Sequence, residues 1–131
     1  MQLTMSLDIY PAPVLTSIIQ SNIWIDVSPE ARMIGFTQKV EVSQSLSDAL
    51  QPIQTEDEDA YEQRLYDALW LAHHYLCLEE RSSFSFTLDF LRDDLVAGRM
   101  TESSLRLHLE MCGSTVSLGL LEDFPNRLHS P

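Results

Sequence analysis

The sequence predicts an α+β fold in which a three-stranded or slightly larger antiparallel sheet packs on one long central helix, with short N-terminal helices and strands. From Tyr61 to Leu78, apolar residues recur three and four positions apart, which places them on one face of an α-helix. Farther along, the stretches 84–90, 105–111 and 116–120 alternate large apolar residues with polar ones, as half-buried strands do. A helix laid on a sheet buries both kinds of apolar face at once.

The long helix is expected to begin in the segment 55–62, TEDEDAYE, and to end near Glu80. Thr55 stands three residues before Glu58, the spacing of a capping box, and acidic residues are favoured at the positive end of a helix dipole. Aromatic and apolar residues between 66 and 78 widen the apolar face. The second half of this helix is therefore expected to be largely covered.

Short elements are expected in the N-terminal part of the chain. In order they are an extended lead-in over 1–13, a helix over 14–21, a strand over 23–27, a helix over 29–34, a strand around 40–42 and a helix over 43–50. Ser28 and Ser43 are expected to cap the last two helices through their hydroxyls. Gly35 is expected to end the helix that Ser28 begins.

The C-terminal part is expected to be built from strands and turns. Gly113 and Ser114 predict a hairpin between the last two strands. The segment 92–102 reads as a longer connection with a helical turn near Gly98, and 125–131 as a loose tail. A length of 131 residues fits one domain, so 1–131 is expected to fold as a single unit.

The chain is strongly acidic: 8 basic residues against 20 acidic ones give a net charge of −12. This field repels phosphate, so we expect neither direct nucleic-acid binding nor a membrane partner, and basic proteins are the natural counterpart. No signal peptide is evident, and no apolar run approaches the roughly 20 residues that a bilayer requires. Cys77 and Cys112 do not form a disulfide framework. We expect a cytoplasmic protein.

The candidate partner-binding site is the run of acids around the start of the long helix. Its members are Glu56, Asp57, Glu58, Asp59, Glu62 and Asp67. Concentrated carboxylates imitate phosphates and suit the basic groove of a nuclease or another nucleic-acid-binding protein. The alternative is that these acids only stabilise a solvated helix start. Their spacing differs from that of a calcium loop.

His73, His74 and Cys77 are the nearest approach to a metal site in the sequence. His73 and Cys77 are four positions apart and share a helix face, but neighbouring histidines point about 100° apart. No fourth ligand is evident, so we expect no metal and no other cofactor. Cys77 on an apolar helix also lacks the surroundings of an activated thiolate.

Arg106, His108 and Glu110 fall on the polar side of a predicted strand, with Asp89 and Thr87 expected opposite them. An acid–base site is one interpretation, because histidine titrates near neutral pH. A solvated sheet face with cross-strand charge pairs is the alternative. Phosphate-cradling glycine loops and GxSxG or HExxH motifs are missing from the sequence, so we do not expect an enzyme.

Three blocks together resemble an uncharacterised family of small proteins encoded by phages and plasmids. They are IIQSNIWIDVSPEARMIGF at 18–36, LYDALWLA at 65–72 and SLRLHLEMCGSTVSLGLLED at 104–123. The family has a glycine where this chain has Asn22 and a proline where it has Lys39. The resemblance implies an origin in a mobile genetic element and brings neither an activity nor catalytic residues.

Charge, size and this resemblance lead to one main functional hypothesis. We expect a non-enzymatic binding protein, of the anti-CRISPR or anti-restriction type, that inhibits a host nucleic-acid-handling defence complex by covering its basic surface. A second hypothesis is a homo-oligomeric structural or accessory module that assembles through the sheet edge. A third is a small hydrolase that uses His108 and nearby carboxylates.

Overall fold

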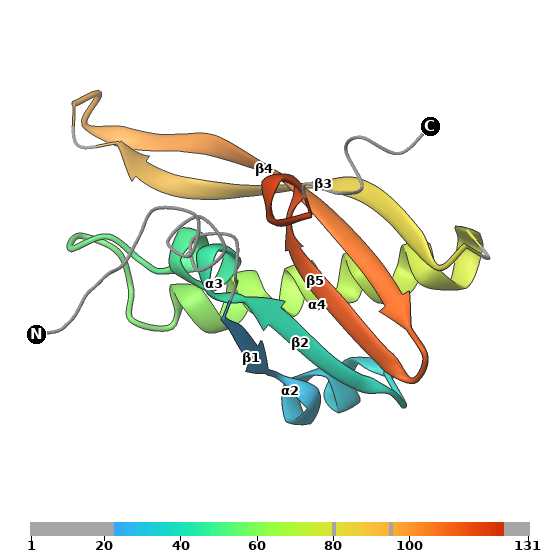
Figure 1. Ribbon diagram of the computed structural model, residues 1–131. Helices are drawn as coiled ribbons and strands as arrows, with labels where there is room; N and C mark the ends of the chain where they lie inside the picture. Colours follow the sequence, from blue (N-terminus) through green and yellow to red (C-terminus); the bar gives the residue numbers. More distant parts are fainter. Residues whose placement is uncertain (1–22, 80, 95, 125–131) are drawn as a thin grey trace, which may run out of the picture.

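The computed structural model describes residues 23–79, 81–94 and 96–124, and over this part of the chain the fold is α+β, as predicted (Figure 1). The elements are β1 (Trp24–Asp26), α2 (Ser28–Ile34), β2 (Lys39–Ser43), α3 (Gln44–Leu50), α4 (Ala60–Glu79), β3 (Ser83–Asp94), β4 (Arg99–Cys112), β5 (Thr115–Leu120) and the 3-10 turn η1 (Leu121–Asp123). The predicted lead-in over 1–13, helix over 14–21 and tail over 125–131 lie outside the described residues.

The described strands form one mixed, five-stranded sheet in the order β1-β2-β5-β4-β3. β2 runs parallel to β5, whereas every other neighbouring pair is antiparallel. The predicted three-stranded antiparallel sheet is present as β3, β4 and β5, but the whole sheet is larger and includes a parallel pair. A parallel pair needs a long crossover, and here the chain between β2 and β5 passes through α3, α4 and the β3–β4 hairpin.

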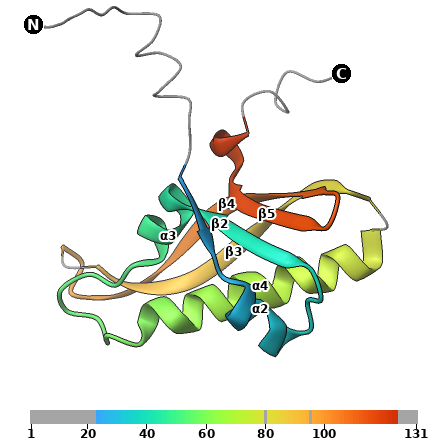
Figure 2. The same cartoon turned by 60° about the horizontal axis from the view of Figure 1, so that its bottom comes forward.

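The hydrophobic core lies between the sheet and the helices α2 and α4, which pack on the same face of the sheet (Figure 2). Val40, Val42, Leu107, Leu109, Val116 and Leu118 from the sheet are fully buried, as are Ala68 and Leu69 from α4. The alternation predicted for the three C-terminal strands places their apolar side chains on this face.

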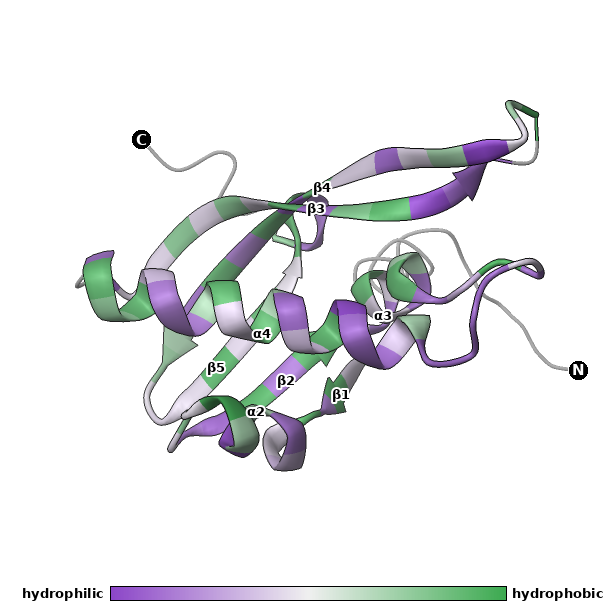
Figure 3. Cartoon of the chain, turned by 180° about the vertical axis from the view of Figure 1, so that it is seen from behind, coloured by the Kyte–Doolittle hydropathy of each residue, from purple (hydrophilic) through white to green (hydrophobic). Residues whose placement is uncertain are grey.

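The second half of α4 is more exposed than its composition predicts. Its buried residues are Arg64, Leu65, Ala68, Leu69 and Ala72, the three-and-four stripe alone. Trp70 and Leu78 are 56% and 62% exposed, and apolar positions are visible on the side of α4 that faces away from the sheet (Figure 3). The prediction of a largely covered helix is wrong, because α4 is an outer layer on the sheet.

The two capping serines behave differently. Ser43 Oγ accepts a hydrogen bond from the Leu46 amide at 3.1 Å, so the predicted cap of α3 is confirmed. Ser28 Oγ instead accepts from the Val40 amide at 2.9 Å, and α2 has no side-chain cap. Ser28 therefore joins α2 to the neighbouring β2. Gly35 ends α2 as predicted, at a φ of 129°.

Both hairpins of the sheet are tight. Gly113, with a φ of 62°, turns β4 into β5 as predicted. The predicted long connection over 92–102 is wrong, because β3 and β4 continue pairing out to Asp94 and Arg99. A single helical turn is present, since the Gly98 amide donates to the Asp94 carbonyl, four residues back, at 2.8 Å. The turn beyond them includes Gly98, with a φ of 69°. The end of the β3–β4 hairpin, called the β3–β4 arm below, projects beyond the rest of the sheet (Figure 1).

Replacing Gly119 by alanine is expected to destabilise the fold by about 1–3 kcal/mol, as overpacking does. A Cβ there would lie 2.9 Å from Asp123 Oδ2, 3.0 Å from Ser43 Oγ and 3.1 Å from Phe124 Cε1. The Asp123 carboxylate accepts from Ser43 Oγ at 2.6 Å and so has little freedom to withdraw. Urea unfolding measures the loss, and a variant as stable as the parent would show that η1 moves aside freely.

Candidate functional site

The predicted acidic site divides into one buried and five exposed carboxylates. Asp57, Glu58, Asp59, Glu62 and Asp67 are exposed. The Glu56 side chain is only 4% exposed and lies inside the protein. The structure therefore places the Glu56 side chain largely inside the protein and leaves the other five on the surface.

Glu56 is held by an ionic cluster that also explains where α4 begins. Its carboxylate lies 2.7 Å from Arg64 Nη2 and 3.7 Å from Arg92 Nε. It also accepts hydrogen bonds from the amides of Ile53, at 2.8 Å, and Asp93, at 3.0 Å. These bonds fold 53–59 into turns, and α4 begins at Ala60, inside the segment 55–62 predicted for its start. Thr55 and Glu58 both precede the helix, so the predicted capping box is wrong.

The cluster keeps Glu56 ionised. Burial by itself raises the pKa of Glu56, but hydrogen bonds from Arg64 and from the amides of Ile53 and Asp93 outweigh it, and they lower the pKa from 4.5 to about 2. The folded protein therefore binds this proton less readily than the unfolded chain does.

This shift predicts an acid-sensitive fold. The contribution of Glu56 is fully present above its unfolded pKa of 4.5 and is lost as the pH falls toward about 2. Urea midpoints measured across this range should fall for the parent and fall less for Glu56→Gln, which has no carboxylate to protonate. Parallel curves for the two proteins would contradict the assignment.

Arg64 is the cation at the centre of the cluster. It is 6% exposed, and its guanidinium donates to the carbonyls of Leu50 and Leu91, each at 3.1 Å. It also lies over the Phe90 ring, 4.6 Å from the centroid. Arg64 and Glu56 together fasten the end of α3, the start of α4 and the edge of β3.

A groove of about 400 Å³ opens beside this cluster, between the first half of α4 and the β3–β4 arm. Its acidic lining comes from Asp57, Asp67, Asp89 and Asp93, and Phe90, Leu91 and Met100 supply apolar surface. The buried pair Glu56 and Arg64 also lines it, so carboxylates outnumber cations in the groove. Of the predicted site residues, Glu56, Asp57 and Asp67 line the groove, whereas Glu58, Asp59 and Glu62 do not. Asp89 and Asp93 were missed, because only the fold brings β3 to the start of α4.

His73 and Cys77 line a second hollow, of about 460 Å³, together with Gly35, Arg81 and Met111. The His73 ring packs edge-on against Phe36 at 4.9 Å, whereas His74 stacks on Trp70. Within the described residues, no three histidine, cysteine or acidic side chains gather closely enough to hold a metal ion. The two histidines point to different surroundings, as their adjacency on a helix requires.

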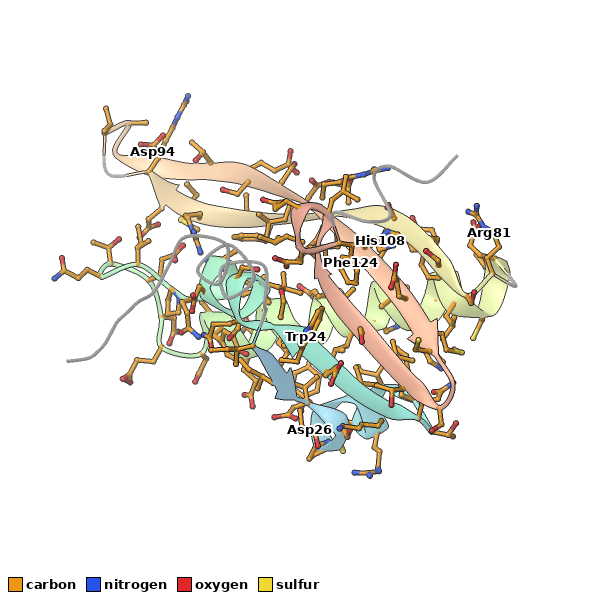
Figure 4. All side chains as sticks on the ribbon, viewed as in Figure 1. Trp24, Asp26, Arg81, Asp94, His108 and Phe124 are labelled. Carbon is orange, nitrogen blue, oxygen red and sulfur yellow. The ribbon has the colours of Figure 1, made fainter. Side chains whose placement is uncertain are left out.

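His108 lies on the sheet face opposite α4, beside Phe124, as the side chains in Figure 4 show. Ser85 Oγ is 2.8 Å from its Nδ1, and Ser83 Oγ is 3.1 Å from its Nε2. A Glu110 carboxylate oxygen lies 3.5 Å from Nε2, and His108 is 6% exposed. Of the two predicted cross-strand partners, Thr87 opposes Arg106 and accepts a hydrogen bond from it, whereas Asp89 opposes Ser104 instead. His108 itself is enclosed rather than solvated.

Comparison with protein-family models, with curated proteins and with solved structures gives no match for this chain. Over the part that the structure describes, no helix combines the length and apolarity needed to cross a bilayer. The function must therefore be argued from the charge of the chain and the geometry of its surface.

Proposed function

We propose that this protein is a non-enzymatic, acidic binding protein of a phage or plasmid, acting in the cytoplasm of the bacterial host. It inhibits a host complex that grips nucleic acid, of the CRISPR or restriction type, by covering that complex's basic surface. The groove lined by Asp57, Asp67, Asp89 and Asp93 is the observation that carries this proposal.

The positions of these carboxylates favour a binding site for a basic side chain over the alternative interpretation, in which the acids only stabilise a helix start. Its exposed carboxylates come from the turn before α4, from α4 itself and from β3, and none of them lies in the first turn of α4. The helix dipole therefore does not account for Asp67, Asp89 or Asp93. Apolar surface from Phe90 and Met100 adds contact for the aliphatic stem of a lysine or arginine.

The overall charge supports the same partner chemistry. A net charge of −12 creates a long-range field that speeds encounter with a basic surface and repels free nucleic acid. Salt weakens such attraction, because exposed charges are screened over about 10 Å at 0.1 M ionic strength.

Affinity capture from host lysate tests the proposal. The tagged protein is expected to retain a nucleic-acid-handling complex at low salt and to release it at high salt, with both fractions identified by mass spectrometry. If the same amount of complex is retained at low and at high salt, or if no such complex is captured, the proposal is contradicted. Glu56→Gln is unsuitable as a negative control, because it destabilises the fold and leaves the exposed acids unchanged.

A further inference from the structure

The edge strand β3 has a regular alternation of bonded and outward-facing backbone groups. In an antiparallel strand, the N–H and C=O groups of successive residues point alternately toward the strand on one side and the strand on the other. Ser82 O accepts from the Met111 amide at 2.6 Å, so the even-numbered residues that follow direct their N–H and C=O groups toward β4. Pairing runs without a register shift from Ser83 to Asp94. The odd-numbered residues of β3 therefore direct their N–H and C=O groups to the outer edge of the sheet.

The ionic cluster already occupies the far end of this edge. Arg64 Nη2 donates to Leu91 O at 3.1 Å, and Glu56 Oε2 accepts from the Asp93 amide at 3.0 Å. These two side chains stand where the peptide groups of another strand would stand. They end the open edge at Asp89.

The remaining edge is open over four outward-facing residues, Ser83, Ser85, Thr87 and Asp89. In the sheet order β3 has β4 as its single neighbour, and no described backbone group bonds to the outer side of these residues. The segment 83–89 contains neither lysine nor proline, the residues that commonly block edge pairing. Asp89 also lines the acidic groove, so the open edge leads directly into it.

We propose that β3 receives an extended, basic segment of the partner protein as an added strand. The backbone of that segment pairs with Ser83, Ser85, Thr87 and Asp89, and a lysine or arginine at its end enters the groove lined by Asp57 and Asp67. This mode of binding rests on the proposed function, because it supplies the means by which the acidic groove holds its basic partner.

Charge selects this occupant over a second copy of the chain. Two copies would bring together two molecules of net charge −12, and their paired 83–89 segments would supply no cation for the groove. Arg81, just before β3, is already paired with Glu79 at 2.6 Å. A basic strand, by contrast, satisfies both the backbone edge and the carboxylates.

Two synthetic peptides test the proposal by fluorescence anisotropy. One is a short peptide of alternating lysine and threonine, and the other is the same peptide N-methylated on the edge that would pair. Both carry the same charge, but the second lacks the backbone donors. We expect the methylated peptide to bind on the order of tenfold more weakly or worse. Equal binding of the two peptides, or no binding of either, would overturn strand addition.

Variants at Thr87 test the same edge from the side of the protein. Thr87→Pro removes an outward N–H that β4 does not use, and it should reduce binding of the unmethylated peptide as strongly as methylation does. Thr87→Val keeps the N–H and should bind like the parent. A Thr87→Pro variant that is folded by circular dichroism and binds like the parent would overturn the proposal, and if this variant does not fold, the peptide pair on the parent decides.

The outcomes separate strand addition from the proposed function and from self-association. If a variant with Asp57, Asp67 and Asp89 each changed to lysine loses salt-sensitive capture while Thr87→Pro still captures the complex, the proposed function is retained and strand addition is overturned. Peptide pairing without capture of any nucleic-acid-handling complex would retain strand addition and remove the proposed function. If the parent sediments as a dimer and Thr87→Pro as a monomer, the edge of β3 pairs with a second copy of the chain and the proposal is overturned.

Discussion

Glu56→Gln is expected to lower the free energy of unfolding by about 3 kcal/mol, the lower end of what breaking a buried ion pair costs. The amide has the size of the carboxylate but a single acceptor oxygen, so it keeps the bond from the Ile53 or the Asp93 amide and directs its NH2 group at the other donor. It leaves the Arg64 guanidinium, which is 6% exposed, without its nearest counter-charge. Chemical denaturation followed by circular dichroism measures the loss.

Glu58→Gln is the matched control for this substitution. Glu58 is exposed and belongs to the same acidic run, so its loss should change the stability by no more than about 0.5 kcal/mol. If the two variants unfold at the same denaturant concentration, Glu56 does not hold the segment 53–59 to β3 in the way the contacts indicate.

Reversing the exposed acids of the groove has the largest effect expected on binding. Asp57, Asp67 and Asp89, each changed to lysine, should weaken capture of the basic partner by about 100-fold or more, since like charges brought together cost several kcal/mol. The three side chains are exposed, so the fold should remain intact. Glu56 is left unchanged, because its reversal would unfold the site that is being tested.

The matched control reverses three exposed acids elsewhere: Asp48, Glu102 and Glu122. It changes the net charge by the same amount but leaves the groove untouched. If both triple variants lose binding equally, the overall charge of the chain, rather than the groove, is what the partner recognises. Affinity of the captured complex for each protein, measured by calorimetry at one salt concentration, decides between these results.

Local sequence determined much of the secondary structure but not the roles of individual polar residues. The alternation in 84–90 and 105–111 and the turn at Gly113 were sufficient to predict the C-terminal strands and their hairpin. Ser28 and Ser43 precede helices in similar ways, yet only Ser43 caps one. The difference is that β2 brings the Val40 amide to Ser28, a contact no local pattern encodes.

In the candidate site too, local sequence did not determine the roles of individual polar residues. The acidic run was visible in the sequence, but which acid is buried depends on Arg64 and on the Asp93 amide, which reach Glu56 only in the folded chain. Asp89 and Asp93 enter the groove for the same reason. The short β1 and β2 gave too few residues to predict that the sheet would extend past β5 with a parallel pair.

Competition with nucleic acid shows whether this protein covers the basic surface of its partner. Labelled DNA or RNA is bound to the complex captured from lysate, and this protein is then added while the anisotropy of the label is followed. We expect stoichiometric release by the parent, no release by the Asp57, Asp67 and Asp89 reversal, and release by the Asp48, Glu102 and Glu122 control. A complex that holds this protein and its nucleic acid at the same time would show that the two do not share a surface, contrary to the proposed function.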